Sequence, residues 1–592
     1  MQRSALRRRS TVFLVVVCAV LALFVGRLLW VQLLHAGEIN AEAEGRRGAS
    51  LTLWGERGDI LDANGVVLAG SVDRFDVTAA PSLIGDVTTV GEDGEERVTA
   101  TSGEVLVQIA RITGQDPAAL VESVNRTIEA DPESDFMYLA RGATLEQYER
   151  IREIGASWLY FERHPQRHYP NGAVAGNLTG FLMPDGSEPL AGLEFTQDQC
   201  LAGHDGSVEY VRGADGVMIP GSEAVVEQAR AGGDLQLTIE RDTQWYAQQV
   251  IAQEVLRTGG QYGHVTVMDV KTGRLVAVAE YPSVDPNDPA ASPPEDRGSR
   301  AFTSPFEPGS TIKPVTIAAA FEAGLSSPGE RLVVPGSWDR DGASFRDDWA
   351  HGDEPLTTAG IMALSSNIGT ALIGERLTAQ QRYDNLIAFG FDQTTASGFL
   401  GEEPGTVHPW QDWDGQTNYT TMFGQGMETT APQIASAYQT LANGGVRMPV
   451  QLVAGCRGPN GEFSPAPAGE PVRVISQEAA SQVLATLEAT AQSGHYAAEV
   501  AIPGYRVGVK TGTAQVAAGD GSYLAGRYFT SMAGVAPIDD PRYVVSVSIM
   551  DPAKIGSSAA TAPAWHDVMA YVLHHNRVPA SPGPWPTIPT TY

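Results

Sequence analysis

The first 35 residues constrain the chain most strongly, because a basic start leads directly into a long apolar run. Four arginines and no acidic residue occur in residues 1–10, and residues 11–26 are apolar after the leading Thr. A helix that ended at residue 26 would be too short for a hydrocarbon layer of about 30 Å, whereas one through residue 34 rises about 36 Å. Under the positive-inside rule we expect a cytoplasmic tail at residues 1–10, a single transmembrane helix at residues 11–34, and all later residues outside the inner membrane.

A cleaved signal peptide is the alternative for this segment. The tripeptide Ala41-Glu42-Ala43 loosely resembles a cleavage site. The apolar core of a signal peptide is typically about 7–15 residues long, and the stretch in this chain is longer. We therefore predict that the segment is retained as an anchor in the cell membrane.

Charge and cysteine content argue against two broad classes of protein. The 592 residues carry 40 Lys and Arg against 70 Asp and Glu, and the formal net charge of −30 has the wrong sign for binding nucleic acid through its phosphates. Only three cysteines occur, and the two outside the apolar segment, Cys200 and Cys456, lie far apart in the sequence. A disulfide framework is therefore not expected, and whether these two thiols are free stays open.

Turn residues and hydrophobic patterns divide the exported part into three segments. The texture changes at residues 232–233, after which residues 235–239 alternate like a strand and Asp242 is placed to cap a helix that ends at Gly259. Five prolines in the last fifteen residues are typical of an extended tail. We expect one domain at residues 35–232, a second at residues 233–576 and a Pro-rich tail at residues 577–592.

The local patterns predict different elements in the two domains. In the first domain, residues 57–69 read as a hairpin around an Asp-Ala-Asn-Gly turn, residues 85–103 as a surface loop, and residues 104–160 as helical. In the second domain, strand patterns near its two ends enclose a mixture of helices and turns. That arrangement predicts an α/β (α+β) domain with helices packed against an antiparallel sheet.

One lysine stands in a pattern typical of nucleophilic catalysis. The chain has only four lysines, and Lys313 follows Ser310 by three residues in a stretch predicted to be helical as far as Gly324. The i,i+3 spacing puts both side chains on one face. A lysine held away from water beside other cations has a lowered pKa and can take the proton of a hydroxyl. Ser310 is therefore a candidate nucleophile; the alternative is that Ser310 only caps the helix and Lys313 is solvated.

Two further motifs follow in the order that this chemistry needs. Ser365 and Asn367 form a Ser-x-Asn motif, which can supply a hydroxyl for a proton relay and an amide to hold a substrate peptide group. A Lys-Thr-Gly-Thr motif lies on a predicted strand and contains Lys510, Thr511, Gly512 and Thr513. The glycine lets a substrate backbone pair closely with the strand, and the lysine and the hydroxyls suit a terminal carboxylate. The backbone N–H groups of Ser310 and Thr513 are candidates for an oxyanion hole.

Similar tripeptides elsewhere are predicted to have no part in the chemistry. Residues 123–125 (Ser-Val-Asn) repeat the second motif, and we expect them on the surface of an amphipathic helix. Residues 271–273 (Lys-Thr-Gly) repeat the third, and we expect them in a hairpin turn before the serine motif.

As a set, the three motifs are the signature of penicillin-binding proteins and class A β-lactamases. The chain resembles the class B penicillin-binding proteins, the monofunctional D,D-transpeptidases, and most of all their division-type, FtsI-like members from actinobacteria. The resemblance extends from the apolar segment to about residue 575 and includes the stretches Arg57–Ala69, Tyr169–Gly172, Gly192–Glu194, Leu237–Ile239, Ser304–Ser310 and Gly424–Gly426. It departs at Ala63, where many members have Arg.

The resemblance implies a fold and a reaction. The fold is the penicillin-binding-protein transpeptidase fold, which is like that of serine β-lactamases, with an antiparallel sheet between helices at residues 233–576. It stands on an elongated pedestal domain at residues 35–232 above one transmembrane helix. In the implied reaction Ser310 attacks the penultimate D-Ala carbonyl of a peptidoglycan stem peptide and expels the terminal D-Ala. The acyl-enzyme then passes to an amine of a neighbouring stem.

The resemblance also implies residue roles and partners. Lys313 is the base and Ser365 the proton shuttle, Asn367 orients the substrate, and Lys510, Thr511, Gly512 and Thr513 lie on its carboxylate side. No metal or organic cofactor is required. β-Lactam antibiotics would acylate Ser310. A membrane glycan polymerase and other cell-division proteins are the implied partners in septal cell-wall synthesis.

Several alternatives share the motifs. A soluble β-lactamase lacks a pedestal of about 200 residues, a β-lactam sensor carries a His-Glu-x-x-His element, and a bifunctional class A enzyme has a glycosyltransferase domain; none of these matches the stretch between the anchor and Ser310. Three alternatives stay open: a D,D-carboxypeptidase that uses water as acceptor, an elongation-type transpeptidase, and a catalytically silent division scaffold.

Overall fold

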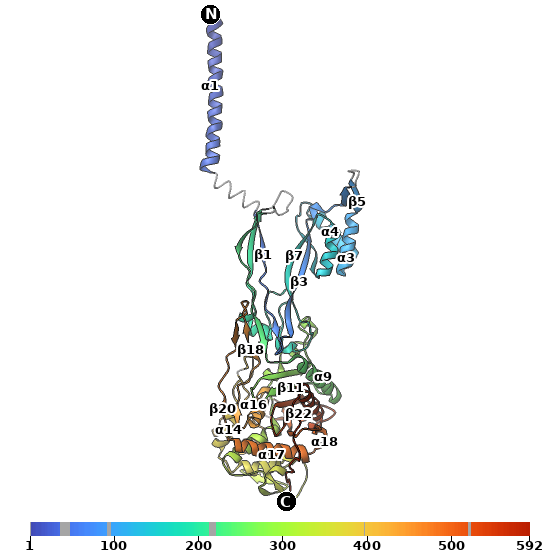
Figure 1. The fold of residues 1–592 in the computed structure, drawn as a ribbon, viewed down its shortest axis with the longest axis vertical. Helices are drawn as coiled ribbons and strands as arrows, with labels where there is room; N and C mark the ends of the chain where they lie inside the picture. The colour runs from blue at the N-terminus through green and yellow to red at the C-terminus, as the bar shows by residue number, and fades with distance from the viewer. Residues whose placement is uncertain are drawn as a thin grey trace. The chain divides into compact units, whose positions relative to one another are not determined.

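The structure is a computed structural model that describes residues 2–35, 48–90, 96–211, 219, 221–395, 397–518 and 522–592. It divides into two units (Figure 1). Unit 1 contains residues 1–56 and 203–231, and unit 2 contains residues 57–202 and 232–592. Most of the segment predicted as a first domain therefore belongs to the same unit as the predicted catalytic domain.

Unit 1 contains a long N-terminal helix and a small sheet. Helix α1 (Gln2–Leu29) continues into a π-helical turn, η1 (Trp30–Leu34), and Thr11–Gln32 is apolar and long enough to cross a membrane. The sheet has the order β1-β8-β9, with bounds Gly48–Leu53, Gly206–Val211 and Ala224–Glu227. The possible cleavage site at residues 41–43 lies outside the described residues.

The N-terminal part of unit 2 is built on a long strand, β3. The predicted hairpin is present as β2 (Ile60–Leu61) and β3 (Val67–Ala79), and the Asp62 carboxylate accepts from the N–H groups of Asn64 and Val66 in the turn. Strand β3 pairs with β6 (Met137–Ala143) and β7 (Leu159–His168). Strand β2 pairs with β10 (Asp234–Leu237), which lies at the start of the second predicted domain.

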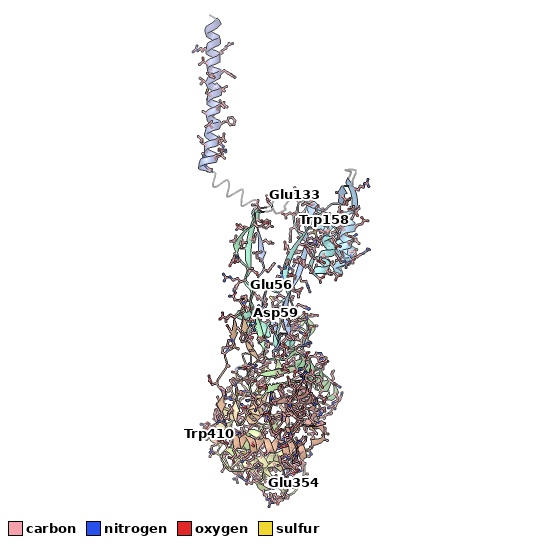
Figure 2. All side chains as sticks on the ribbon, in the orientation of Figure 1. Glu56, Asp59, Glu133, Trp158, Glu354 and Trp410 are labelled. Carbon is pink, nitrogen blue, oxygen red and sulfur yellow. A yellow bond between two sulfur atoms is a disulfide. The ribbon has the colours of Figure 1, made fainter. Side chains whose placement is uncertain are left out.

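Two local predictions in this region were wrong. Residues 85–103, expected as a loop, contain the paired strands β4 (Val87–Val90) and β5 (Glu96–Ala100). Residues 104–160, expected as helical, contain α3 (Ser102–Thr113), α4 (Pro117–Ala130) and α5 (Leu145–Arg152), but β6 lies between α4 and α5. A single core joins these helices to β3 and β6 and includes Trp158, which is labelled in Figure 2. The strand is therefore stabilised by tertiary packing that local patterns do not reveal.

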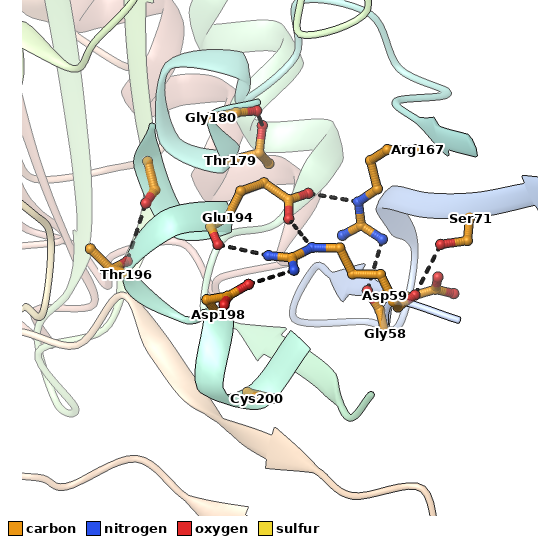
Figure 3. A network of polar contacts seen from close by, with 12 residues as sticks. Gly58, Asp59, Ser71, Arg167, Thr179, Gly180, Glu194, Thr196, Asp198 and Cys200 are labelled. Carbon is orange, nitrogen blue, oxygen red and sulfur yellow. Dashed lines mark hydrogen bonds and ion pairs between the residues drawn. The ribbon is translucent and has the colours of Figure 1, made fainter. Parts of the chain in front are cut away.

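A buried cluster of charged residues stabilises the start of this region, just before β2 (Figure 3). The Glu194 carboxylate, which is fully buried, accepts from Arg57 Nε at 2.7 Å and from Arg167 Nε at 2.7 Å. Arg57 also donates to Asp198 Oδ1 at 2.6 Å, and Arg167 to the carbonyl of Gly58 at 2.8 Å. These bonds tie the stretch before β2 to the short helices α7 (Gly192–Thr196) and α8 (Asp198–Leu201).

A disulfide joins Cys200 to Cys456, contrary to the expectation from their sequence separation. Cys200 lies in the short helix α8, and its carbonyl accepts from the N–H of Gly233 just before β10. Cys456 lies in β18 (Val453–Arg457) opposite Leu235 of β10. Pairing of β10 with β18 therefore brings two distant parts of the chain within bonding reach.

The second predicted domain, at residues 233–576, contains the predicted antiparallel sheet, in the order β12-β11-β23-β22-β21. Its strands are β11 (Tyr262–Asp269), β12 (Leu275–Tyr281), β21 (Gly508–Ala517), β22 (Tyr523–Ala536) and β23 (Tyr543–Met550). Helices α9 (Arg241–Thr258) and α19 (Ala562–His575) pack on one face, and α16 (Ala431–Ala442) and α17 (Gln477–Ser493) on the other. Strand β21 is an edge strand, so one side of it is free to pair with another chain.

Shorter elements complete the second predicted domain around this sheet. Among the described residues, its remaining helices of seven residues or more are α11 (Lys313–Glu322), α12 (Thr358–Leu364), α13 (Asn367–Gly374) and α14 (Ala379–Ala388). Strands β13 (Arg331–Val334) and β16 (Glu354–Thr357) form a small separate sheet. The Pro-rich residues 577–592 contain no helix and hydrogen-bond to this domain.

Candidate active site

Ser310 lies in a 3₁₀ turn, η5 (Gly309–Ile312), that leads into α11. The N–H of Lys313 donates to the carbonyl of Ser310, and side chains three residues apart eclipse one another in a 3₁₀-helix. The predicted helix therefore starts with a tighter turn, which keeps Ser310 and Lys313 on one edge. Pro314 is tolerated because it occupies the first turn of α11, where N–H groups have no intrahelical acceptor.

The structure brings both motif lysines to Ser365. Lys510 Nζ donates to Ser365 Oγ at 2.8 Å, and Lys313 Nζ lies 3.3 Å from the same oxygen. Lys313 Nζ also donates to the Ser365 carbonyl and, at 2.7 Å, to Asn367 Oδ1. Four of the predicted residues from three separate motifs therefore form one hydrogen-bonded cluster.

Burial sets the protonation of the two lysines. Both side chains are fully buried. Burial lowers the pKa of Lys313 to about 8, against the opposing effect of the Asp347 and Asp348 carboxylates. Burial, together with the nearby charge of Lys313, lowers the pKa of Lys510 well below its usual value. Burial thus favours the neutral form of each amine, which is the form that general-base catalysis requires.

The backbone holds Ser365 in an uncommon conformation between two helices. Ser365 follows the last residue of α12 and has a φ of 61°, in the left-handed region. Ser366 caps the next helix, α13, by accepting from the N–H of Gly369. The Ser-x-Asn motif thus occupies a helix-to-helix junction, and such strain is often retained at functional sites.

Asp347 anchors this junction and was missed by the sequence analysis. Its fully buried carboxylate accepts from Ser366 Oγ at 2.6 Å and from the N–H groups of Asn367 and Ile368 at 2.6 and 3.0 Å. His351 Nε2 lies 3.2 Å from the same carboxylate. The only sequence signal is that the start of α13 needs an acceptor for its first N–H groups, which does not distinguish Asp347 from other acids.

The Lys-Thr-Gly-Thr motif lies on edge strand β21, directly against the serine turn. A Cβ at Gly512 would come within 2.3 Å of Ser531 Oγ and 2.9 Å of Thr311 Cγ2, so only glycine fits. Thr511 Oγ1 lies 3.2 Å from Lys510 Nζ, and Thr513 Oγ1 lies 3.4 Å from Ser558 Oγ. Residues 508–517 therefore present lysine, hydroxyls and a free strand edge together.

A second loop supports the serine turn from behind. The N–H of Gly309 donates to the carbonyl of Gly424 at 2.9 Å. Glu307 Oε1 accepts from the N–H of Gly426 at 2.8 Å and from the Tyr523 hydroxyl at 3.1 Å. These contacts fix the entry to Ser310, and Glu307 and Tyr523 were not singled out from the sequence.

The two similar tripeptides outside the site, which we call the decoys, lie where the sequence predicted. Ser123 and Asn125 are exposed on α4, on either side of the buried Val124. Residues 271–273 form the turn between β11 and β12, where Asp269 accepts from Lys271 and Thr272.

Comparison with known proteins gives the family. Residues 263–570 match the penicillin binding protein transpeptidase domain, and residues 52–237 match the penicillin-binding protein dimerisation domain. Penicillin-binding protein PbpB of Mycobacterium tuberculosis is 34% identical over 95% of this chain and 84% of its own length. Peptidoglycan D,D-transpeptidase FtsI of Escherichia coli K12 is 28% identical over 93% of this chain and 89% of its own length.

Solved structures agree with this relationship. Penicillin binding protein 3 of Mycobacterium tuberculosis in complex with ampicillin has a TM-score of 0.71 and 29% identity, and the match covers 92% of this chain and 100% of that chain. A peptidoglycan synthetase from Bifidobacterium adolescentis has the same TM-score, identity and coverage. The chain therefore belongs to the class B penicillin-binding proteins and is a peptidoglycan D,D-transpeptidase.

Proposed function

We propose that this enzyme crosslinks peptidoglycan stem peptides through an acyl-enzyme on Ser310. The observation that carries the proposal is the convergence of the buried Lys313 and Lys510 on Ser365 Oγ, beside the turn that holds Ser310. Attack on the penultimate D-Ala carbonyl forms an ester and releases the terminal D-Ala as an amine. An amine of a second stem then attacks the ester and frees the serine.

The cluster supplies a path for the proton in each half-reaction. Neutral Lys313 takes the proton of Ser310, and Ser365 passes a proton to the leaving amine, while Lys510 holds the Ser365 hydroxyl by donating to it. The N–H groups of Ser310 and Thr513 stabilise the oxyanion. The return of a proton from the incoming amine follows the same path in reverse.

We assign the substrate to the free edge of β21. An extended stem peptide adds to this edge as a strand, with Asn367 bonded to its peptide group and its carboxylate near Lys510, Thr511 and Thr513. Gly512 keeps the strand close to the serine turn. β-Lactams acylate Ser310 in the same position; the ampicillin and aztreonam complexes of the mycobacterial relative support this.

We place the reaction outside the cell membrane and at the division septum. Thr11–Gln32 anchors the chain with its basic N-terminus in the cytoplasm, the pedestal at residues 35–232 carries the catalytic domain at residues 233–576, and residues 577–592 form a tail. The septal role is supported by the similarity to FtsI, and with it go a membrane glycan polymerase and division proteins as partners. A carboxypeptidase reaction, an elongation role and a silent scaffold are the competing proposals.

Labelling of the full-length protein with a fluorescent penicillin tests the proposal. We expect covalent labelling of the parent chain, none in Ser310→Ala, and strongly reduced labelling in Lys313→Ala and Ser365→Ala. The decoys provide matched controls, because Lys271→Ala and Ser123→Ala change the same residue types outside the site. Labelling of Ser310→Ala at the parent rate would refute the nucleophile assignment. Stem peptides offered with and without an amine acceptor separate transpeptidase from carboxypeptidase activity.

A further inference from the structure

The last residues of the chain pack against the helix that ends at Ser365. We call residues 586–592 the C-terminal strap. Thr591 forms a β-bridge with Leu356 of β16, and the ring of Tyr592 lies under the guanidinium of Arg331, 5.1 Å from its centre. The C-terminus and Glu354, the first residue of β16, accordingly lie at the same end of unit 2 (Figures 1 and 2).

The strap bonds directly to the residue that caps α12. The N–H of Thr357 donates to the carbonyl of Thr590 at 3.1 Å, and the Thr357 hydroxyl donates to the carbonyl of Pro589 at 2.7 Å. The same hydroxyl accepts from the N–H of Gly360 at 3.0 Å and so caps the helix. The strap therefore fixes the direction of the hydroxyl that starts α12.

Gly360 leaves room for the strap. A Cβ at this position would lie 1.9 Å from the carbonyl oxygen of Thr590. Gly360 is in the first turn of a helix and has no positive φ, so the helix itself has no need of glycine there. Glycine weakens a helix relative to alanine, which makes its presence here most simply explained by the close approach of the strap.

The strap also contacts α17, which packs against α12. Gln492 Nε2 donates to the carbonyl of Pro586 at 3.0 Å. Farther upstream, the N–H of Ser581 donates to the carbonyl of Gly504, and Ser581 Oγ accepts from the N–H of Arg506, just before β21. The C-terminal segment thus runs from the start of the Lys510 strand to the start of the Ser365 helix.

We propose that the C-terminal strap is a positioning element for Ser365, acting through Thr357 and Gly360 at the other end of α12. A helix of seven residues is about 10 Å long and moves as one body, so a shift at its first turn is transmitted to Ser365. Displacement of a catalytic group by about 1 Å can lower a rate by about 100-fold. The inference rests on the proposed role of Ser365 in the proton path.

The test is the acylation kinetics of full-length protein with a chromogenic β-lactam, resolved into a binding constant and a first-order acylation constant. Gly360→Ala places a methyl group where the Thr590 carbonyl lies and should lower the acylation constant about tenfold or more, with the binding constant little changed and a fall in melting temperature no larger than local overpacking explains. Gly103→Ala, in the first turn of α3 with open space around it, is the matched control and should behave as the parent. Thr357→Val should show the same loss, and Thr357→Ser should restore the parent rate.

A truncated chain gives the decisive comparison. Removal of residues 586–592 should lower the acylation constant as much as Gly360→Ala does, and Gly360→Ala should add no further loss in the truncated chain. A synthetic peptide of residues 583–592 should restore the rate of the truncated chain but not that of its Gly360→Ala form. If the truncated chain does not fold, as circular dichroism will show, the Gly360 and Thr357 variants decide.

Two outcomes overturn the inference in distinguishable ways. Parent-like acylation constants in Gly360→Ala and Thr357→Val would overturn the strap while leaving the proposed function intact. A melting temperature that falls in step with the rate, without rescue by Thr357→Ser or by the peptide, would reduce the strap to a purely structural role. If the parent protein itself is not acylated, the proposed function fails and the inference falls with it.

Discussion

Lys313 and Lys510 reach the same oxygen atom: their Nζ atoms lie 3.3 Å and 2.8 Å from Ser365 Oγ. Both amines are buried, and the charge of Lys313 further lowers the pKa of Lys510. Two like charges at this separation away from water favour a state in which the pair holds one proton. A proton lost from the pair leaves an amine that is able to act as a base.

The acylation rate should rise with pH through about 8. Burial lowers the pKa of Lys313 to about 8 from its usual value of 10.5, so the amine becomes a base as pH rises past that point. Below it Lys313 is protonated and cannot accept the serine proton. The second-order rate constant for β-lactam acylation, determined between pH 6 and 10, measures this rise, with Lys271→Ala as the control. A profile that stays flat through 8, or that rises only near 10.5, would exclude Lys313 as the base.

Replacement of Asp347 should lower the free energy of unfolding far more than replacement of its neighbour Asp348. Asp347→Ala leaves the buried Ser366 hydroxyl and two N–H groups without their acceptor, at about 1–3 kcal/mol for each group. We expect the free energy of unfolding to fall by about 3 kcal/mol, with a large drop in acylation rate. Loss of the carboxylate also lowers the pKa of Lys313 further, so the remaining acylation rate should rise with pH at a value below 8. Urea denaturation measures the stability.

Asp348→Ala is the matched control for the stability measurement, because its side chain is exposed. It should leave the free energy of unfolding close to the parent value. Equal losses in the two variants would show that the junction does not depend on the Asp347 hydrogen bonds.

Gly512→Ala should abolish acylation. The added Cβ would come within 2.3 Å of Ser531 Oγ, 2.9 Å of Thr311 Cγ2 and 3.1 Å of the Pro308 carbonyl, so β21 has to move away from the serine turn. Overpacking of this kind costs about 1–3 kcal/mol in stability. Penicillin labelling and thermal melting measure the two effects, and Gly298→Ala, which meets no atom within 4 Å, is the control. Parent-like labelling of Gly512→Ala would contradict the close contact of strand and turn.

Contacts between neighbouring residues of the site could be predicted from the sequence, whereas contacts between distant segments could not. The i,i+3 spacing of Ser310 and Lys313 predicted the turn in which the Lys313 N–H donates to the Ser310 carbonyl. The bond from Lys510 to Ser365 crosses 145 residues, and only the order of the three motifs pointed to it. Asp347 and Asp348 are adjacent acids, and nothing but tertiary burial makes one an anchor and leaves the other in solvent.

The same distinction holds for the fold. The hairpin at residues 57–69, the helix that Gly259 ends and the antiparallel catalytic sheet followed from turn chemistry and alternation. Strand β6 did not, because its short sequence is set between helices and is defined by pairing with β3. The Cys200–Cys456 disulfide did not either, because the pairing of β10 with β18 determines the distance between the two cysteines.

Reduction of the Cys200–Cys456 disulfide should destabilise the enzyme. A crosslink across so long a loop restricts the unfolded chain, and loss of a native disulfide typically costs about 2–5 kcal/mol. We expect a reductant to lower the melting temperature of the parent protein and to have no effect on Cys200→Ser, which should melt at the lower temperature from the outset. Cys456→Ser should match it. A reductant-insensitive parent would show that the two thiols are not bonded in the folded protein.

Glu194 should be the most sensitive position in the pedestal. Its fully buried carboxylate is shared by Arg57 and Arg167, whose side chains are themselves largely buried, so Glu194→Ala leaves two cations with too few partners. Removal of one partner from a buried ion pair costs about 3–5 kcal/mol. Asp198→Ala is the control, because that carboxylate is 44% exposed and, among the residues that the structure describes, pairs only with Arg57. Limited proteolysis and thermal melting of the full-length variants measure this difference in stability. The Glu194 cluster ties the stretch before β2 to α7 and, in the described part of the chain, does not contact the lysine cluster around Ser365. Penicillin labelling of the intact fraction should therefore persist. Equal stability of the two variants would show that water reaches the guanidinium groups and that the cluster does not hold the pedestal together.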